Sequence, residues 1–239
     1  MNHIVGYQLI AHHQSSIVLN YKIYCAALSI SLITSSILLL SGCSPKGPLP
    51  KHESVLRALT EKRYEAAINK LDTLIAHQPD SMQHYMLRGY AHDKLQNYEA
   101  GIADFTTAIQ LDSSSATAYN NRGYAYYLSD QPQLAEQDYT RAIRLDSTFS
   151  PTYGNRTLLY VSIGQYKQAV QDIDRALVLG DTLNSTYYNL KGYSELQLDH
   201  PTLAVRALTK AVRLHSNYTD ALSNLVRARR SLSDSIRIK

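Results

Sequence analysis

Small and apolar residues recur along the chain at helical spacing, in short segments separated by polar turns. The clearest example spans residues 119–146, where Tyr-Asn-Asn-Arg-Gly-Tyr-Ala-Tyr-Tyr is followed, after a short break, by Leu-Ala-Glu-Gln-Asp-Tyr-Thr-Arg-Ala-Ile-Arg-Leu-Asp. Because residues three and four apart share one face of a helix, this pattern predicts two helices joined by a turn.

The same pattern returns every 34 residues. Moving back by one period from this stretch reaches Gly89, Phe105 and Ala108, and moving forward reaches Asn155, Ala169 and Ile173. A period of 34 with glycine, alanine and aromatic residues at fixed offsets resembles the tetratricopeptide repeat (TPR) family. The resemblance implies an all-α, right-handed solenoid of helical hairpins, closed by a C-terminal capping helix.

The period divides residues 51–239 into a predicted solenoid domain. Its repeats are expected at about 48–81, 82–115, 116–149, 150–184 and 185–218, with a capping helix at 219–239. The last full repeat is displaced by one residue because the turn at 180–183 is longer. Gly101 occupies a slot where other repeats carry alanine, which predicts a local weakening of that helix.

The first 42 residues read as a lipoprotein signal peptide. Lys22 precedes an uncharged apolar run that ends in Leu-Ser-Gly followed by Cys43, which resembles the bacterial lipobox. The resemblance implies cleavage before Cys43 and acylation of its sulfur. Residues 43–50 are then an acylated cysteine and a proline-rich tether that holds the solenoid close to the membrane.

Two alternatives for this leader stay open. An apolar run of about twenty residues is also long enough to remain as a transmembrane helix. The region before the run is long and contains a single lysine, so the true translation start is also open.

Charge and motifs exclude several function classes. The net charge is +4, with basic residues spread among acids, which argues against nucleic acid as a partner. Metal-binding and hydrolase motifs are not found, and Cys25 and Cys43 are the two cysteines, so we expect neither an enzyme nor a metal site. Asp104, Asp138 and Asp172 recur at one offset and are interpreted as an exposed row on second helices.

Function in such an architecture must come from a surface, and the resemblance places the first helix of each repeat on the concave side. Tyrosine offers a rigid face with a polar tip, and asparagine can bond peptide amides as donor and acceptor. An alternative is that these tyrosines pack inward and the asparagines bridge neighbouring repeats. The candidate peptide-binding residues are Tyr90, Asn120, Asn121, Tyr124, Tyr127, Asn155, Asn189, Tyr193 and Asn224.

The sequence therefore predicts a membrane-anchored TPR lipoprotein that acts as a protein interaction scaffold or assembly adaptor in the bacterial cell envelope. The expected partner is another envelope protein or a peptide segment, with no cofactor besides the lipid on Cys43. Ser44 after the cysteine favours the outer membrane, facing the periplasm, over the inner membrane or the cell surface. The alternative function is binding of carbohydrate or peptidoglycan fragments by the tyrosine faces.

Overall fold

The computed structural model describes residues 51–237, and the predicted leader, Cys43 and the tether lie outside this range. The described residues form eleven helices. They are α2 (Lys51–Thr60), α3 (Tyr64–His77), α4 (Met82–Lys94), α5 (Tyr98–Leu111), α6 (Ala116–Leu128), α7 (Pro132–Leu145), α8 (Ser150–Ser162), α9 (Tyr166–Val178), α10 (Ser185–Gln197), α11 (Pro201–Leu214) and α12 (Thr219–Arg237).

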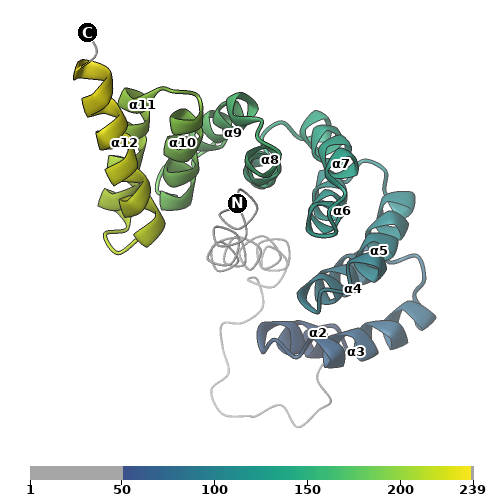
Figure 1. Cartoon of the computed structure of the whole chain (residues 1–239). Helices are drawn as coiled ribbons and strands as arrows, with labels where there is room; N and C mark the ends of the chain where they lie inside the picture. The colour runs from purple at the N-terminus through teal and green to yellow at the C-terminus, as the bar shows by residue number, and fades with distance from the viewer. Residues whose placement is uncertain (1–50, 238–239) are drawn as a thin grey trace, which may run out of the picture. The chain divides into compact units, whose positions relative to one another are not determined.

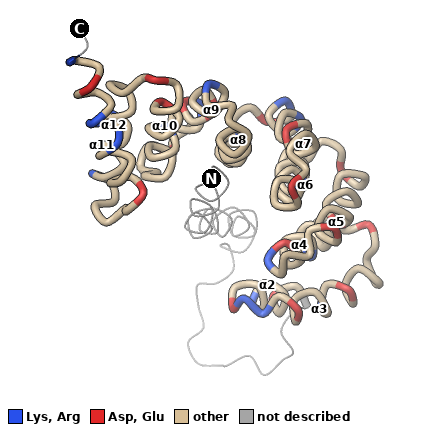
Figure 2. The backbone as a smooth tube through the Cα atoms, in the orientation of Figure 1, with Lys and Arg blue, Asp and Glu red and all other residues tan. Residues whose placement is uncertain are grey.

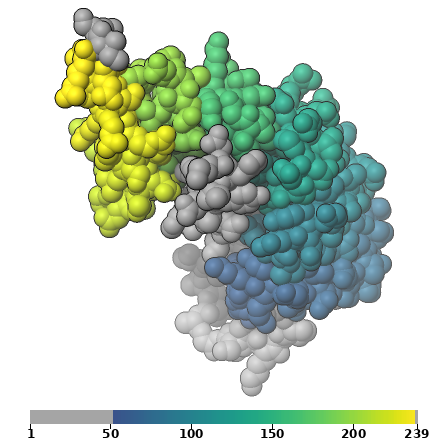
Figure 3. Space-filling view, in the orientation of Figure 1, coloured from purple at the N-terminus to yellow at the C-terminus, as the bar shows by residue number. Residues whose placement is uncertain are grey.

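Helices α2 to α11 pair two by two, in chain order, into antiparallel hairpins, and the hairpins stack one after another (Figure 1). Helix α12 follows the last hairpin. The first helices α2, α4, α6, α8 and α10 lie on the inner side of the stack, and the second helices lie on its outer side. The space-filling view shows the successive hairpins in contact along the chain (Figure 3). The prediction of an all-α stack of TPR-type hairpins is confirmed.

Glycine sets the distance between the two helices of a hairpin. A Cβ added at Gly89 would lie 2.8 Å from the ring of Phe105, and one added at Gly192 would lie 2.4 Å from Leu208. At Gly123 the nearest atom, in Tyr139, would be 3.0 Å away. In these three hairpins the large side chain of the second helix therefore fits against bare backbone of the first.

The turn inside each hairpin uses one left-handed residue. Lys62, Gln96, Asp130 and Asp199 have φ between 58° and 62°, and the equivalent Gly164 has φ of 75°. This conformation is uncommon outside glycine, and its recurrence at one repeat position shows that the turn geometry is shared. The turn residues lack a common side-chain type, so the sequence pattern did not reveal it.

The stack is closed at its C-terminal end by α12. Its residues Leu225 and Ala228 pack with Ala204 and Leu208 of α11 in one buried cluster. Val226 occupies the slot that holds Gly89, Gly123 and Gly192 in three of the repeats, and it is 59% exposed because no second helix follows within the described residues. Within residues 51–237, none of the helices combines the length and apolar character that crossing a membrane requires.

Candidate interaction surface

A row of arginines fixes the rotation of the first helices. Arg122 Nε donates to Asp138 Oδ2 at 2.7 Å on α7, and its Nη1 donates to Thr106 at 3.2 Å on α5. Both partners belong to the outer layer of helices. Since a helix turns by about 100° per residue, positions two and five residues after this arginine point to the inner side.

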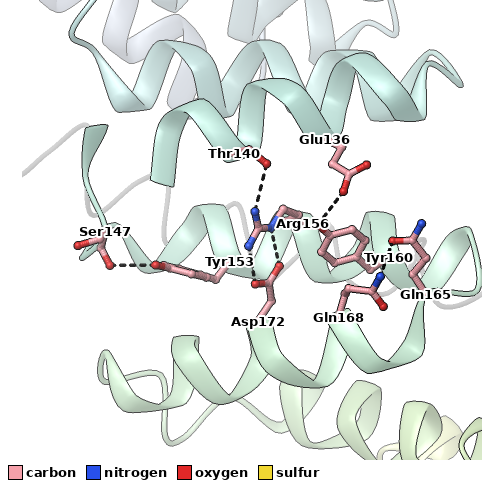
Figure 4. Close-up of polar contacts among 9 residues, drawn as sticks. All are labelled: Glu136, Thr140, Ser147, Tyr153, Arg156, Tyr160, Gln165, Gln168 and Asp172. Atoms are coloured by element: carbon pink, nitrogen blue, oxygen red, sulfur yellow. Dashed lines mark hydrogen bonds and ion pairs between the residues drawn. The ribbon is translucent and has the colours of Figure 1, made fainter. Parts of the chain in front are cut away.

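The arginine contacts recur in the neighbouring repeats. Arg88 binds Asp104 and Asp72 on two second helices. Arg156 binds Asp172 and Thr140 in the same way (Figure 4). Asp104, Asp138 and Asp172 are 4%, 6% and 4% exposed. The interpretation of these aspartates as an exposed row was therefore wrong, because an arginine that reaches from the first helix covers each one.

Burial raises the pKa of Asp172, and the hydrogen bond and charge of Arg156 oppose this effect. The bidentate pairing satisfies the carboxylate oxygens inside the stack, which is the geometry in which buried ion pairs are tolerated. The row of arginine and aspartate pairs is thus a structural link between hairpins, and its side chains are not free to bind a partner.

The predicted asparagine candidates lie inside the stack. Asn120, Asn121, Asn155, Asn189 and Asn224 are between 0% and 8% exposed. Asn155 Nδ2 donates to Asn120 Oδ1 at 3.0 Å, which joins α8 to α6, and Asn120 Nδ2 donates to Asn121 Oδ1 at 3.2 Å.

The same bond recurs near the C-terminus, where Asn224 Nδ2 donates to Asn189 Oδ1 at 3.0 Å and Asn189 Nδ2 donates to the hydroxyl of Tyr218 at 3.1 Å. This arrangement is the one expected if asparagines bridge neighbouring repeats. Their amide groups are occupied by one another and do not face a peptide.

The predicted tyrosine candidates are placed differently. Tyr90, Tyr124, Tyr127 and Tyr193 are each partly exposed. Tyr90 and Tyr124 follow Arg88 and Arg122 by two residues, so their rings point to the inner side of the stack. The inner side thus carries a partly exposed aromatic row that includes Tyr90, Tyr124, Tyr127 and Tyr193, and we call it the tyrosine surface.

Ring packing supports the tyrosines of this surface. The ring of Tyr90 packs edge-on against Tyr64 of α3 with centroids 6.4 Å apart, and the ring of Tyr193 packs edge-on against Tyr166 of α9 at 5.9 Å. Tyr124 lies 6.3 Å from Tyr127 on its own helix. Edge-to-face packing fixes the ring orientation, so the surface is largely preformed.

The pattern is interrupted on α8, where Leu158 occupies the equivalent position. It ends on α12 with Arg227. Burial is the main reason that the pKa of Tyr193 is raised, and the nearby Arg227 acts in the opposite direction. The tyrosine surface therefore ends beside a positive charge, and Figure 2 shows basic residues along α12.

A carboxyl group that the sequence analysis did not single out lies next to this surface. Asp93 follows Arg88 by five residues on α4 and therefore also points to the inner side. Burial raises its pKa to about 8, although Lys94 nearby lowers it. Tyr98 and Tyr124 are close enough for their own pKa values to be raised further by this carboxylate.

Metal binding depends on how the titratable side chains of residues 51–237 are grouped. No group of three or more His, Cys, Asp or Glu side chains is close enough there to hold a metal ion. His200 and Glu195 form a contact at 2.8 Å between Nδ1 and Oε2, which closes the turn after α10.

Comparison with known proteins identifies the repeats. The tetratricopeptide repeat profile matches residues 116–149, and a second TPR repeat profile matches residues 94–130. No curated protein matches the sequence.

Solved structures share the fold. MamA (residues 41 to the end) from Desulfovibrio magneticus RS-1 has a TM-score of 0.63 at 18% identity, covering 70% of this chain and 94% of that one. TTC0263, a thermophilic TPR protein from Thermus thermophilus, has a TM-score of 0.58 at 16% identity, covering 77% and 99%. YrrB, described as a TPR protein with an unusual peptide-binding site, has a TM-score of 0.60 at 15% identity, covering 74% and 91%. Residues 94–149 therefore carry TPR repeats, and the described residues as a whole form a stack of TPR-type helical hairpins.

Proposed function

We propose that this protein is a lipid-anchored scaffold of the bacterial cell envelope that binds a segment of another protein on its tyrosine surface. TPR repeats imply protein or peptide partners, and the observation that carries the proposal for this chain is the row of partly exposed tyrosines on the inner helices. Tyr90 and Tyr193 are held by rings of the preceding repeats, so little conformational entropy is lost when a partner covers them.

Burial of the asparagines changes how a partner would be recognised. A continuous row of exposed amides would bind the backbone of an extended peptide, whereas the tyrosine surface offers flat faces to side chains. We therefore expect partner side chains to provide most of the affinity. The structure of YrrB is a precedent for peptide binding on a TPR protein.

The binding test compares two tyrosines of one helix. Tyr193→Ala removes a ring of the tyrosine surface, whereas Tyr188→Ala removes a partly exposed ring that packs beside Lys210 of α11. The acylated wild type and both variants are used to capture partners from envelope fractions, with mass spectrometry as the readout. We expect Tyr193→Ala to lose the partner and Tyr188→Ala to keep it at an unchanged melting temperature. Equal capture by both variants would place the contact surface elsewhere.

The proposal of a lipid anchor depends on the sequence around Cys43. Cells expressing the wild type and Cys43→Ala are fed a lipid probe, and labelling is measured on the purified protein. The wild type should be labelled and the variant should not, and separation of the membranes should place the labelled protein in the outer membrane. Equal labelling of both proteins would refute acylation at this cysteine.

Carbohydrate binding is the second candidate, favoured by Asp93 beside the partly exposed rings of Tyr98 and Tyr124. Aromatic faces with an adjacent carboxylate can stack on sugar rings and accept bonds from their hydroxyls. Binding of soluble peptidoglycan fragments, measured by calorimetry, distinguishes the two functions. Binding that survives Tyr188→Ala and is lost in Tyr124→Ala would support the carbohydrate function.

A further inference from the structure

Asp93 and Gly101 form a matched pair in one hairpin. The repeat position of Asp93 holds Tyr127, Val161 and Leu196 in the later hairpins, and the position of Gly101 holds Ala135, Ala169 and Ala204. A Cβ added at Gly101 would lie 2.5 Å from Asp93 Oδ1. The carboxylate therefore occupies the space that an alanine methyl group fills elsewhere, and Gly101 makes room for it.

This carboxylate lacks the partners that a buried charge requires. Asp93 Oδ1 is inaccessible to solvent and has no hydrogen-bond partner among the described residues, and the hydroxyl of Tyr139 on α7 is in the same condition. A buried charge without a partner is unfavourable, which explains why burial raises the pKa of Asp93 to about 8. Asp93 and Tyr124 are both partly exposed, so the group can be reached from the inner side.

The neighbouring cation of the chain does not neutralise the carboxylate directly. Lys94 Nζ lies 5.1 Å from the centroid of the Tyr90 ring, and its charge lowers the pKa of Asp93 less than burial raises it. A tyrosine of this surface therefore already binds an ammonium group over its face. The contact is a precedent, on the tyrosine surface itself, for a cation over a tyrosine ring.

We propose that Asp93, together with Tyr98, Tyr124 and Tyr127, forms a pocket for a cationic side chain, lysine or arginine, of the bound protein segment. This inference rests on the proposed function, because it names the chemistry of the partner on the tyrosine surface. The cation of the ligand would form an ion pair with the carboxylate of Asp93, and the surrounding rings would contact the cation through their faces. Neutral segments would leave Asp93 unpaired and bind more weakly.

Proton release provides a signature of this pocket. In the free protein Asp93 has a pKa of about 8 and holds its proton at neutral pH. A cation bound against the carboxylate favours the charged form, so binding should expel that proton. Calorimetry at neutral pH in buffers of different ionisation enthalpy measures it. A merely structural aspartate would give no such release.

The test selects ligands from a library of random peptides displayed on phage, using the full-length protein in detergent. Selected peptides should share one lysine or arginine, and acetylation of that lysine should weaken binding to the wild type at least tenfold. Asp93→Asn should weaken binding of the unmodified peptide to a similar degree, abolish proton release, and make the protein indifferent to acetylation.

Two further variants separate charge from geometry. Gly101→Ala keeps the charge but forces the carboxylate out of its position, and it should weaken binding as Asp93→Asn does. Glu99→Gln removes an exposed carboxylate from the first turn of α5 and should leave affinity unchanged. Peptides that bind without a shared cation, at equal strength to the wild type and Asp93→Asn, would overturn the pocket and leave the proposed function standing. If no peptide is selected, or if every selected peptide binds Tyr193→Ala as tightly as the wild type, the proposed function would be contradicted as well.

Discussion

The middle hairpins and the C-terminal hairpin are linked to their neighbours by different forces. Arg122 pairs with Asp138 of its own hairpin, whose side chain is 8% exposed. At the equivalent position Lys191 contacts Asp174 of the preceding hairpin, whose side chain is 51% exposed. The partner position within its own hairpin holds Ala207, which is buried.

The comparison shows that one fold tolerates two solutions at the same contact. In the middle hairpins a planar guanidinium joins a buried carboxylate to a second helix of the preceding hairpin. The buried carboxylate is tolerated because the guanidinium bonds both of its oxygens. In the C-terminal hairpin the buried side has become apolar, and the remaining cation is paired near solvent. We therefore expect variants of the middle region to respond to loss of charge, and variants of the C-terminal region to respond to loss of apolar cover.

Deletion of α12 should have the largest effect. The helix covers Leu208 and Ala204 of α11, and its removal from Thr219 onward exposes this apolar cluster to water. We expect the truncated protein to aggregate and to melt at a much lower temperature, as measured by light scattering and circular dichroism. A truncated protein that stays monomeric with wild-type melting would contradict the role of apolar cover in this region.

Asp93 should make the free energy of unfolding of the middle region depend on pH. Because its pKa in the folded protein is about 8, well above the usual value, the folded state keeps a proton that the unfolded state loses. Stability of the wild type should therefore fall as the pH rises from about 4 to about 8, by at most about 1.4 kcal/mol per pH unit from this group.

Asp93→Asn is neutral throughout, so its stability relative to the wild type should rise over the same range and then level off. Urea denaturation at several pH values measures the difference. A difference that is independent of pH would show that the carboxyl is not buried in its neutral form.

Removal of a buried aspartate should cost more than removal of an exposed one. Asp138→Ala leaves Arg122 without its main partner inside the stack and should lower the free energy of unfolding by about 3 kcal/mol. Asp174→Ala breaks an exposed pair and should cost less than about 1 kcal/mol. Urea denaturation of both variants measures the loss in free energy of unfolding. Equal losses would contradict the difference between the two regions.

The asparagine bonds should contribute similar amounts to stability in both regions. Asn155→Ala and Asn224→Ala each leave a buried acceptor without its donor, on Asn120 and Asn189 respectively. We expect a loss of about 1 to 3 kcal/mol in each case. Thermal melting without any partner measures it. If the variants melt at the wild-type temperature and bind the partner more weakly, the asparagines would be assigned to the binding surface instead.

Much of the fold could be predicted from the sequence. The period of 34 and the opposed glycine and large residues, such as Gly89 with Phe105, indicate hairpins because only close helix contact requires bare backbone at that spacing. The tyrosine surface also followed from the period, since helical phase alone places Tyr90 and Tyr124 on one face.

The tertiary structure decided which polar residues are buried. Asp138 and Asn155 have polar side chains at positions that an isolated helix would expose, and they are enclosed only because a neighbouring hairpin packs over them. The sequence interpretation of Gly101 as a local weakening also missed its partner, since Asp93 lies on another helix at a distance that spacing does not reveal. Periodicity determines the phase of a helix, whereas burial depends on contacts between helices, and these exist only in the assembled stack.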